Sequence, residues 1–509
     1  MSSVPAARAP AATGRLSHAA AQKAIAAVAV LFFVKAATLA LFVTPLWDVP
    51  DESGHLAYVL DLADGRGLPV YGRTPLPPEV LARWDARGSA VPAFNWVAQH
   101  PPLSHAIAAP FALAARGATS DREARLRAPR LASVLAATLA LIVLFQVLRE
   151  ATDDAAFALA GAACVSFVPM YSHLASGTHN EPLLALAGSL AGLGWVRLVR
   201  SGALEDAFRT AAALGLAGAT KLTALPVAAG LLILMPLYLT RQKGWRKGVT
   251  WLLAAAIALA APAFWLLRNW LTAGHPLVYA APEAFSPGRL AQLLAREPVF
   301  DHTFKNFLGL IGWMGGGQLR WFQISGLFLG AYLAAGLLVV SAAAVWLWRD
   351  SGRLGTPFRT MLRLLCVAAV VAGLLPALSG GPSHPAKHAF YALVLAIPFF
   401  GLALFFGRGD RERELIRSSL WVVLVFLGAY LWNVWRGLAI YGHMRAVHGR
   451  YFLAILPFLM LGFGYPAARL FPRTRARDAA LIGLVLLLAA AEIAFFLVRV
   501  VPFYRAAPG

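Results

Sequence analysis

The chain alternates between long apolar runs and shorter polar segments over most of its length. Membrane-spanning helices need about 20 mainly apolar residues, and about thirteen runs approach or reach that length. The expected spans cover about 24–46, 128–148, 155–171, 182–199, 207–219, 222–239, 249–267, 324–348, 361–378, 389–406, 420–437, 451–470 and 479–500. This pattern predicts an all-α, polytopic integral membrane protein.

Two longer polar stretches interrupt the apolar pattern, at about 47–127 and 268–323. The first contains segments at 51–67 and 103–115 whose apolar residues recur at helical spacing, which predicts amphipathic helices at the membrane surface. No repeat of fixed period and no separate soluble domain is evident. Residues 1–509 are therefore expected to form a single transmembrane domain, with the two polar stretches as external loops on its active face.

Basic residues indicate which side of the membrane each loop occupies. Cytoplasmic loops of membrane proteins are rich in Lys and Arg. Four basic residues occur in each of the segments 241–247, 349–363, 408–417 and 469–477. Placing these segments inside predicts a cytoplasmic N-terminus and an external C-terminus. The first apolar run, of about 23 residues, is longer than that of a typical signal peptide, which predicts an uncleaved first helix.

Composition agrees with a membrane protein and changes the meaning of the net charge. Hydrophobic residues make up 59% of the chain and charged residues 14%, with a formal net charge of +21. Because the basic residues lie mainly between apolar runs, they do not indicate nucleic-acid binding. Both cysteines, Cys164 and Cys366, lie inside apolar runs, which favours a packing role over a disulfide or a metal site.

An acidic segment, Trp47–His55, follows the first expected span directly. It holds three carboxylates, on Asp48, Asp51 and Glu52, and Asp51 and His55 share a face of the expected helix. One interpretation is a helix cap that complements the helix dipole. A cap requires a single acid, so three acids together favour a functional site.

Further polar side chains occur at the expected external boundary of the membrane. Ionisable residues there are candidates for function, and Arg suits phosphate binding because its donors form a planar fork. Arg450 could instead reach a lipid headgroup, and His100 could be an ordinary loop residue. The candidates outside the acidic segment are His100, Glu181, Lys221, Arg445, Arg450 and Tyr451.

Carboxylates and cations on one face suit the attack of a hydroxyl on a carbon whose leaving group is a lipid phosphate. A carboxylate accepts the proton of the attacking hydroxyl or orients it. Cations stabilise the charge that develops on the departing phosphate. No Gly-rich nucleotide-binding loop is evident.

Several motifs occur in an order that resembles the GT-C superfamily of membrane glycosyltransferases. The chain is similar to glycosyltransferase family 39, which includes the protein O-mannosyltransferases, and to the aminoarabinose transferase of lipid A. The motifs are Pro50–Glu52 with His55, Gln99–Leu103, Arg127–Leu131, Asn180–Glu181, Thr220–Lys221 and Gly449–Phe452. The chain also resembles the DUF2142 membrane proteins at Phe167–Met170, Phe307–Trp313 and Gly449–Tyr451.

The resemblance implies an inverting transferase with a GT-C fold in a bacterial-type inner membrane. It would move a sugar from a polyprenyl-phosphate donor to a lipid, glycan or protein acceptor on the extracytoplasmic face. The acidic pair of the family corresponds to Asp51 and Glu52. A second acid corresponds to Glu181, where relatives usually have aspartate. The resemblance implies that these three acids are catalytic, and we expect Asp51 to be the base and Glu52 and Glu181 to orient the acceptor or a metal.

We assign the remaining roles by the same resemblance and by residue chemistry. Lys221, Arg445 and Arg450 are expected to hold the donor phosphate. His55, His100 and Tyr451 are expected to bind substrate.

A divalent metal is used by some relatives. Asp51, His55 and Glu181 are the residues of this chain that could supply its ligands.

Two other functions use similar substrates. A transporter or flippase of lipid-linked sugars predicts paired repeats, broken helices and charges at the bilayer centre. A polysaccharide polymerase or ligase would not need the early acidic segment. The transferase accounts for more of the polar residues.

Overall fold

The computed structural model describes residues 18–85, 93–277, 299–311, 322–378, 385–407, 409–441 and 448–506. These residues are mainly helical. The strands that they contain are β1 (Leu310–Ile311) and β2 (Phe322–Gln323), which pair antiparallel. The prediction of an all-α membrane protein is confirmed.

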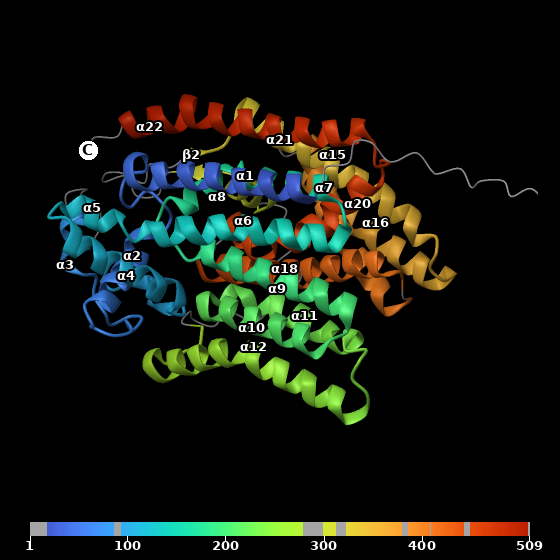
Figure 1. Ribbon diagram of the computed structural model, residues 1–509, viewed down its shortest axis with the longest axis horizontal. Coiled ribbons are helices and arrows are strands. Elements are labelled where there is room, and N and C mark those ends of the chain that lie inside the picture. Colours follow the sequence, from blue (N-terminus) through green and yellow to red (C-terminus); the bar gives the residue numbers. More distant parts are fainter. Residues whose placement is uncertain are drawn as a thin grey trace, which may run out of the picture.

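Ten described helices are long and apolar enough to cross a membrane. They run lengthwise through the molecule (Figure 1). They are α1 (His18–Thr38) with η1 (Leu39–Val43), α6 (Arg130–Thr152), α9 (Glu181–Ser201), α12 (Gly244–Ala273), α15 (Gly326–Ser351), α16 (Thr356–Leu378), α17 (Pro385–Ala396) with η4 (Ile397–Phe405), α18 (Arg411–Tyr441), the run of η5 (Gly449–Ile455), α19 (Leu456–Leu459), η6 (Met460–Gly464) and α20 (Tyr465–Arg469), and the run of α21 (Arg475–Phe495), η7 (Phe496–Val500) and α22 (Val501–Ala506).

A bent pair, α7 (Ala155–Ser166) and α8 (Pro169–Ala175), raises the possible number of described spans to eleven. The two helices meet at 65°. The other two expected spans correspond to shorter helices, α10 (Leu204–Thr220) and η3 (Leu222–Ala224) with α11 (Leu225–Tyr238). Every expected run is thus helical, but length and composition do not confirm thirteen crossings among the described residues.

Small residues on α9 allow the C-terminal part of the chain to approach it closely. A Cβ on Gly188 would overlap the carbonyl group of Ala454, and one on Gly192 would lie 2.9 Å from the ring of Pro457. Small residues at helix interfaces bring backbones together in membrane proteins. This close approach places η5 beside the helix that begins at Glu181.

The first polar stretch folds into short helices that gather at one end of the bundle, on the left in Figure 1. They are α2 (Glu52–Ala63), α3 (Pro78–Asp85), η2 (Trp96–Gln99), α4 (Leu103–Ala118) and α5 (Arg122–Arg127). From the second polar stretch, α14 (Val299–Leu308) is described.

The environment of α2 differs from the expected surface helix. Every residue from Glu52 to Asp61 is buried. The helix packs against α4 and η2, and its apolar residues Leu56, Val59 and Leu60 share a buried cluster with α4. In contrast, α4 has an exposed apolar side, with Ile107 and Leu113 at its surface, as expected for an amphipathic helix at the membrane.

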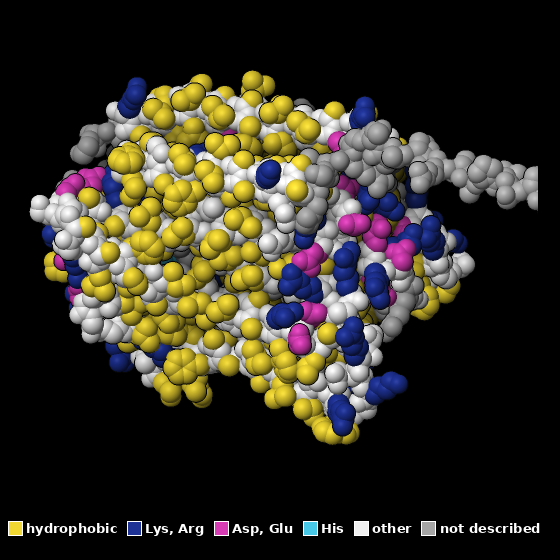
Figure 2. All heavy atoms as spheres, in the orientation of Figure 1, with side chains coloured by type: hydrophobic (Ala, Val, Ile, Leu, Met, Phe, Trp, Pro, Cys, Tyr) yellow, Lys and Arg dark blue, Asp and Glu magenta, His cyan; other side chains and the backbone are white. Residues whose placement is uncertain are grey.

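The two ends of the bundle differ in charge. Figure 2 shows Lys, Arg, Asp and Glu side chains gathered at its right-hand end and a mainly apolar surface beside them. The exposed basic loop before α12 lies at this end, opposite α2 to α5. This charged end is the one that the basic loops predict to be cytoplasmic.

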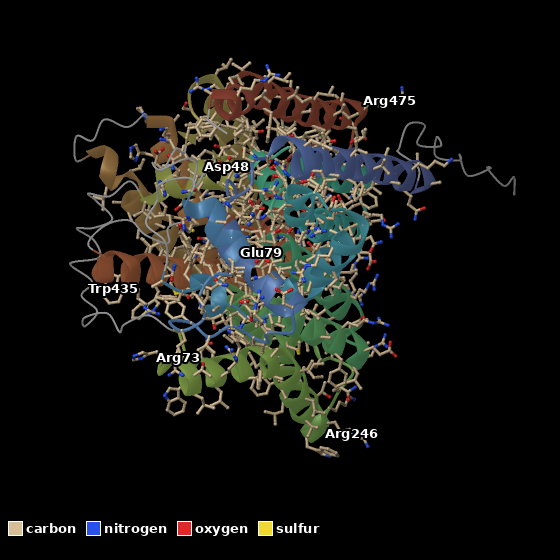
Figure 3. All side chains as sticks on the ribbon, turned by 90° about the vertical axis from the view of Figure 1, so that its left-hand side faces the viewer. Asp48, Arg73, Glu79, Arg246, Trp435 and Arg475 are labelled. Carbon is tan, nitrogen blue, oxygen red and sulfur yellow. The ribbon has the colours of Figure 1, made fainter. Side chains whose placement is uncertain are left out.

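Labelling with a membrane-impermeant maleimide tests the orientation. Arg73 and Arg246 are both exposed, and both are labelled in Figure 3, which looks onto the end that carries α2 to α5. With Cys164 and Cys366 replaced, Arg73→Cys should react in intact cells and Arg246→Cys only after permeabilisation. Reaction of Arg246→Cys in intact cells would reverse the predicted topology.

Candidate active site

The backbone of the acidic segment adopts an unusual conformation. Trp47 and Asp51 both have positive φ angles, of 71° and 59°. Residues other than Gly seldom adopt this conformation, which costs about 1–3 kcal/mol and concentrates at functional sites. The segment is therefore held in place by its surroundings.

Asp51 occupies the N-cap position of α2, but its side chain does not cap the helix. Its Oδ1 accepts a hydrogen bond from Nε1 of Trp96 at 3.1 Å. Its Oδ2 accepts one from Nη2 of Arg450 at 2.9 Å. The capping interpretation does not account for these contacts, because the carboxylate points away from the helix backbone.

Glu52 is fully buried and bound by the protein on both carboxylate oxygens. Arg130 donates two hydrogen bonds to it, at 2.7 and 2.8 Å. The backbone N–H groups of Trp47 and Thr178 donate to it at 2.9 and 3.0 Å. Glu52 therefore joins the acidic segment to α6 and to the turn between α8 and α9.

Arg130 is a partner that the sequence analysis did not identify. Its guanidinium also donates to the carbonyl oxygens of Ala40, Thr44 and Pro45 at 2.7–2.9 Å. These carbonyls lie where η1 ends. In the sequence, the motif Arg127–Leu131 marked this region as basic. It did not indicate which of its arginines would bind Glu52.

Glu181 begins α9 and is surrounded by positively charged and polar groups. Its Oε1 contacts Nζ of Lys221 and lies 3.4 Å from Nε of Arg450. Its Oε2 contacts Nδ1 of His179. The Glu181 side chain has no exposed surface. Burial lowers the pKa of Lys221, and the Glu181 carboxylate acts in the opposite direction.

Arg450 joins the two acidic positions, which lie far apart in the sequence. It is 3% exposed and contacts Asp51 through one nitrogen and Glu181 through another. Tyr451 follows it, and Nζ of Lys221 lies 4.9 Å from the centre of the Tyr451 ring. The structure thus brings together Asp51, Glu181, Lys221, Arg450 and Tyr451. Arg445 lies outside the described residues.

The three candidate carboxylates differ in access. The Asp51 side chain is 27% exposed, whereas those of Glu52 and Glu181 have no exposed surface. Of these three, Asp51 alone can meet a ligand without movement of its surroundings. Glu52 and Glu181 act on their protein neighbours in this conformation.

Four histidines lie together beside Glu181. His55 Nδ1 is 2.9 Å from His105 Nε2, and the ring centre of His55 lies 4.4 Å from that of His179 and 6.2 Å from that of His100. His55 and His100 were predicted from the sequence to bind substrate, whereas His105 and His179 were not. Their positions on α4 and before α9 give no sign that they meet.

Burial lowers the pKa of each of these four histidines. For His105 the pKa falls to about 3. For His55, His100 and His179 it falls well below the usual value, with neighbouring histidines or cations adding to the effect of burial. The imidazoles are therefore neutral near pH 7 and serve as hydrogen-bonding groups.

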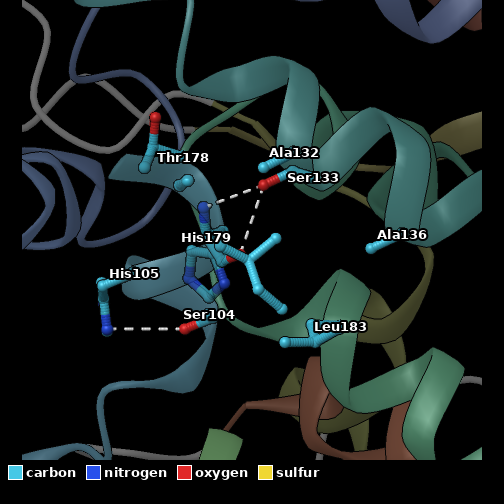
Figure 4. A pocket seen from close by; sticks show the side chains of 10 residues that line it. Ser104, His105, Ala132, Ser133, Ala136, Thr178, His179 and Leu183 are labelled. Carbon is cyan, nitrogen blue, oxygen red and sulfur yellow. Dashed lines mark hydrogen bonds between the residues drawn. The ribbon is translucent and has the colours of Figure 1, made fainter. Parts of the chain in front are cut away.

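A small pocket lies beside this cluster, between α4, α6 and α9 (Figure 4). His105 and His179 contribute to its polar wall, and Ile107, Ala136 and Leu183 to its apolar wall. Ser133 fixes the backbone of His179, accepting from its N–H at 3.2 Å and donating to its carbonyl at 3.3 Å. The His179 backbone is thereby held against α6.

The described residues offer no group of three or more His, Cys, Asp or Glu side chains arranged to hold a metal ion. Asp51, His55 and Glu181 are the residues that could supply ligands if a metal is used. Both carboxylates instead contact cations, which would repel a metal at the same oxygens. A metal there would require Arg450 and Lys221 to move.

Comparison with solved structures gives remote likenesses. ArnT from Cupriavidus metallidurans bound to undecaprenyl phosphate is 15% identical, with a TM-score of 0.42, over 96% of this chain and 78% of ArnT. The S. cerevisiae Pmt1-Pmt2 complex bound to the sugar donor is 16% identical, with a TM-score of 0.35, over 49% of this chain and 33% of that chain. The Archaeoglobus fulgidus oligosaccharyltransferase is 13% identical, with a TM-score of 0.41, over 91% and 53%.

The chain thus spans a third of the yeast protein and about half of the archaeal enzyme. With TM-scores below 0.5, these likenesses assign no activity to it. Comparison with curated proteins gives no match.

A family model provides the stronger comparison. Residues 99–267 match the family described as dolichyl-phosphate-mannose-protein mannosyltransferase. The matched segment contains His100, Glu181 and Lys221, and ends before η5. The resemblance to the GT-C superfamily of membrane glycosyltransferases is thus confirmed by a match to one of its families over residues 99–267 of this chain.

Proposed function

We propose that the chain transfers a sugar, with inversion, from a polyprenyl-phosphate-linked donor to an acceptor of the cell envelope. The reaction would take place at the end of the bundle that carries α2 to α5, on the extracytoplasmic face of the inner membrane. The observation that carries this proposal is Arg450, held between the accessible Asp51 and the buried Glu181. The family match over residues 99–267 supports the same class of reaction.

Asp51 is the base in this proposal. An acceptor hydroxyl gives its proton to the Asp51 carboxylate as its oxygen bonds to the anomeric carbon of the sugar. The bond from that carbon to the phosphate oxygen breaks on the opposite face, and the polyprenyl phosphate leaves with the electron pair. The exposed part of Asp51 provides the access that this step needs.

Arg450 and Lys221 are the cations that receive the leaving phosphate. Arg450 contacts Asp51 before the reaction. When Asp51 takes up the proton, it loses its charge and attracts Arg450 less. The guanidinium can then turn its donors to the phosphate as negative charge develops there, which is electrostatic stabilisation of the transition state.

Glu181 holds the two cations together before the donor binds. Without it, Lys221 and Arg450 would be two like charges buried side by side, which costs free energy. Tyr451 lies against Lys221 and can contact the donor next to the phosphate. His55 and His100 contribute neutral hydrogen-bonding groups behind Glu181.

In this proposal Glu52 touches neither the acceptor nor a metal. It binds Arg130 and the backbone N–H groups of Trp47 and Thr178, and its side chain is enclosed. It orients Asp51 by fixing the backbone of Trp47 and the start of α2.

Asp51→Asn tests the base. Asparagine has nearly the same shape and is an equally good cap, but it accepts no proton from the acceptor. We expect transfer from a synthetic polyprenyl-phosphate sugar to fall by about a hundredfold to ten-thousandfold in purified protein. Turnover near that of the wild type would remove Asp51 from the chemistry.

A matched control is available on the same helix. Asp64 is the C-cap of α2 and pairs with Arg66 and Arg116. Asp64→Asn should keep normal turnover. Glu52→Gln should mainly lower the unfolding temperature, because it leaves the buried Arg130 charge without its partner.

Arg450→Lys tests the phosphate site. Lysine keeps the charge but cannot contact Asp51, Glu181 and a phosphate with a planar fork. Loss of one charge-assisted hydrogen bond, about 1.5–3 kcal/mol, predicts a fall in kcat/KM of roughly tenfold to a hundredfold. Arg469→Lys, at the other end of the same span and paired with Glu412, is the control. Equal activity of the two variants would contradict phosphate binding by Arg450.

A further inference from the structure

Another ion pair joins two membrane-spanning helices outside the candidate active site. Nζ of Lys35 on α1 is 2.7 Å from Oε2 of Glu492 on α21. The Glu492 side chain is 1% exposed and the Lys35 side chain 28%. Charged residues inside spans are costly and usually serve a function. Neither residue takes part in the chemistry proposed above.

The pair lies at the break between α7 and α8. A broken helix leaves backbone carbonyls without their usual partners, and these need other donors inside a membrane. Nζ of Lys35 donates to the carbonyl of Ser166 at 2.6 Å, and the hydroxyl of Tyr332 donates to that of Phe167 at 2.6 Å. The break is therefore held by side chains from α1 and α15.

Glu492 holds the other side of the break. The hydroxyl of Ser172, on α8, donates to its Oε1 at 2.5 Å. Glu492 thus binds Lys35 with one oxygen and α8 with the other. These contacts fix both the carbonyl end of α7 and the direction in which α8 leaves it.

The short helix α8 leads directly into the candidate active site. After it, the side chain of Ser176 lies 3.0 Å from that of Thr44, and the N–H of Thr178 donates to Glu52 at 3.0 Å. Glu181 follows at the start of α9. A change in the direction of α8 would therefore displace the groups that bind Glu52 and lead to Glu181.

We propose that Lys35 and Glu492 are positioning residues for sugar transfer, which set the direction of α8 and thereby the places of Glu52 and Glu181. This inference rests on the proposed function for its link to catalysis. Stability alone explains the pair poorly, because a buried ion pair can often be replaced by apolar residues without loss of stability. A displacement of about 1 Å at a reacting group can reduce the rate about a hundredfold.

The structure supplies a control pair that also involves α21 but joins it to α7. Arg477 on α21 binds Asp154, the N-cap of α7, at 2.8 and 3.2 Å. Both side chains are more than nine-tenths buried. This pair joins α21 to the opposite end of α7, away from α8, so its removal should not move the site.

The first experiment compares two double variants, Lys35→Met with Glu492→Met and Arg477→Met with Asp154→Asn. Each removes both charges of its pair, so neither leaves a buried charge alone. We expect the first to lower kcat by roughly tenfold to a hundredfold, with the KM for the polyprenyl-phosphate sugar within about threefold of the wild type. The control should keep kcat within about twofold at a similar unfolding temperature. Equal kcat in the two variants would overturn the proposal.

The single variant Glu492→Gln keeps the test decisive if the double variant Lys35→Met with Glu492→Met does not fold. Glutamine still accepts from Ser172 but binds Lys35 less strongly. It should lower kcat by a smaller factor, about two to five, because one neutral hydrogen bond replaces a charged one. A kcat equal to that of the control variant would overturn the proposal.

A cross-linking measurement separates this inference from the proposed function. Thr44→Cys and Ser176→Cys, with the native cysteines replaced, place two thiols where the hydroxyls now touch, close enough for a disulfide. We expect the disulfide to form rapidly when Lys35 and Glu492 are present. It should form at least tenfold more slowly in the double variant Lys35→Met with Glu492→Met. If transfer is absent in the wild type but cross-linking depends on the pair, the proposed function fails and the positioning of α8 stands. Cross-linking at the same rate in both would overturn the positioning itself.

Discussion

The buried guanidinium of Arg450 sets the arrangement of the candidate active site. A charge inside a membrane protein requires charged or hydrogen-bonding partners, because water is not there to solvate it. Arg450 finds them in Asp51 and Glu181, which come from the first polar stretch and from the start of α9. Three distant parts of the chain must therefore meet at one point.

Close helix packing makes this meeting possible. Gly188 and Gly192 let α9 approach the backbone of η5 and α19, so that Glu181 and Arg450 come within reach of each other. Gly449 has a related role, since a Cβ there would overlap the carbonyl of Thr303 on α14. Small residues thus bring the charged side chains together, and the charges in turn fix the register of the helices.

The same requirement for paired charges explains the connections behind the site. Arg130 satisfies Glu52 and the carbonyls at the end of η1, and Lys35 satisfies Glu492 and the carbonyl of Ser166. Each basic residue compensates both a carboxylate and backbone oxygens that a helix irregularity leaves open. Irregular helices beside the active site are therefore tolerated where a cation can reach them.

The sequence by itself determined the helical membrane fold, the position of each apolar run and the candidates Asp51, Glu181, Lys221 and Arg450. These follow from composition, from the length of each run and from charges at run boundaries, all of which are local properties. Only the tertiary structure decided which charges meet. It enclosed α2, paired Glu52 with Arg130, gathered four histidines and joined Lys35 to Glu492. The reason is that pairing inside a membrane depends on helix packing between distant segments, which periodicity along a single chain does not specify.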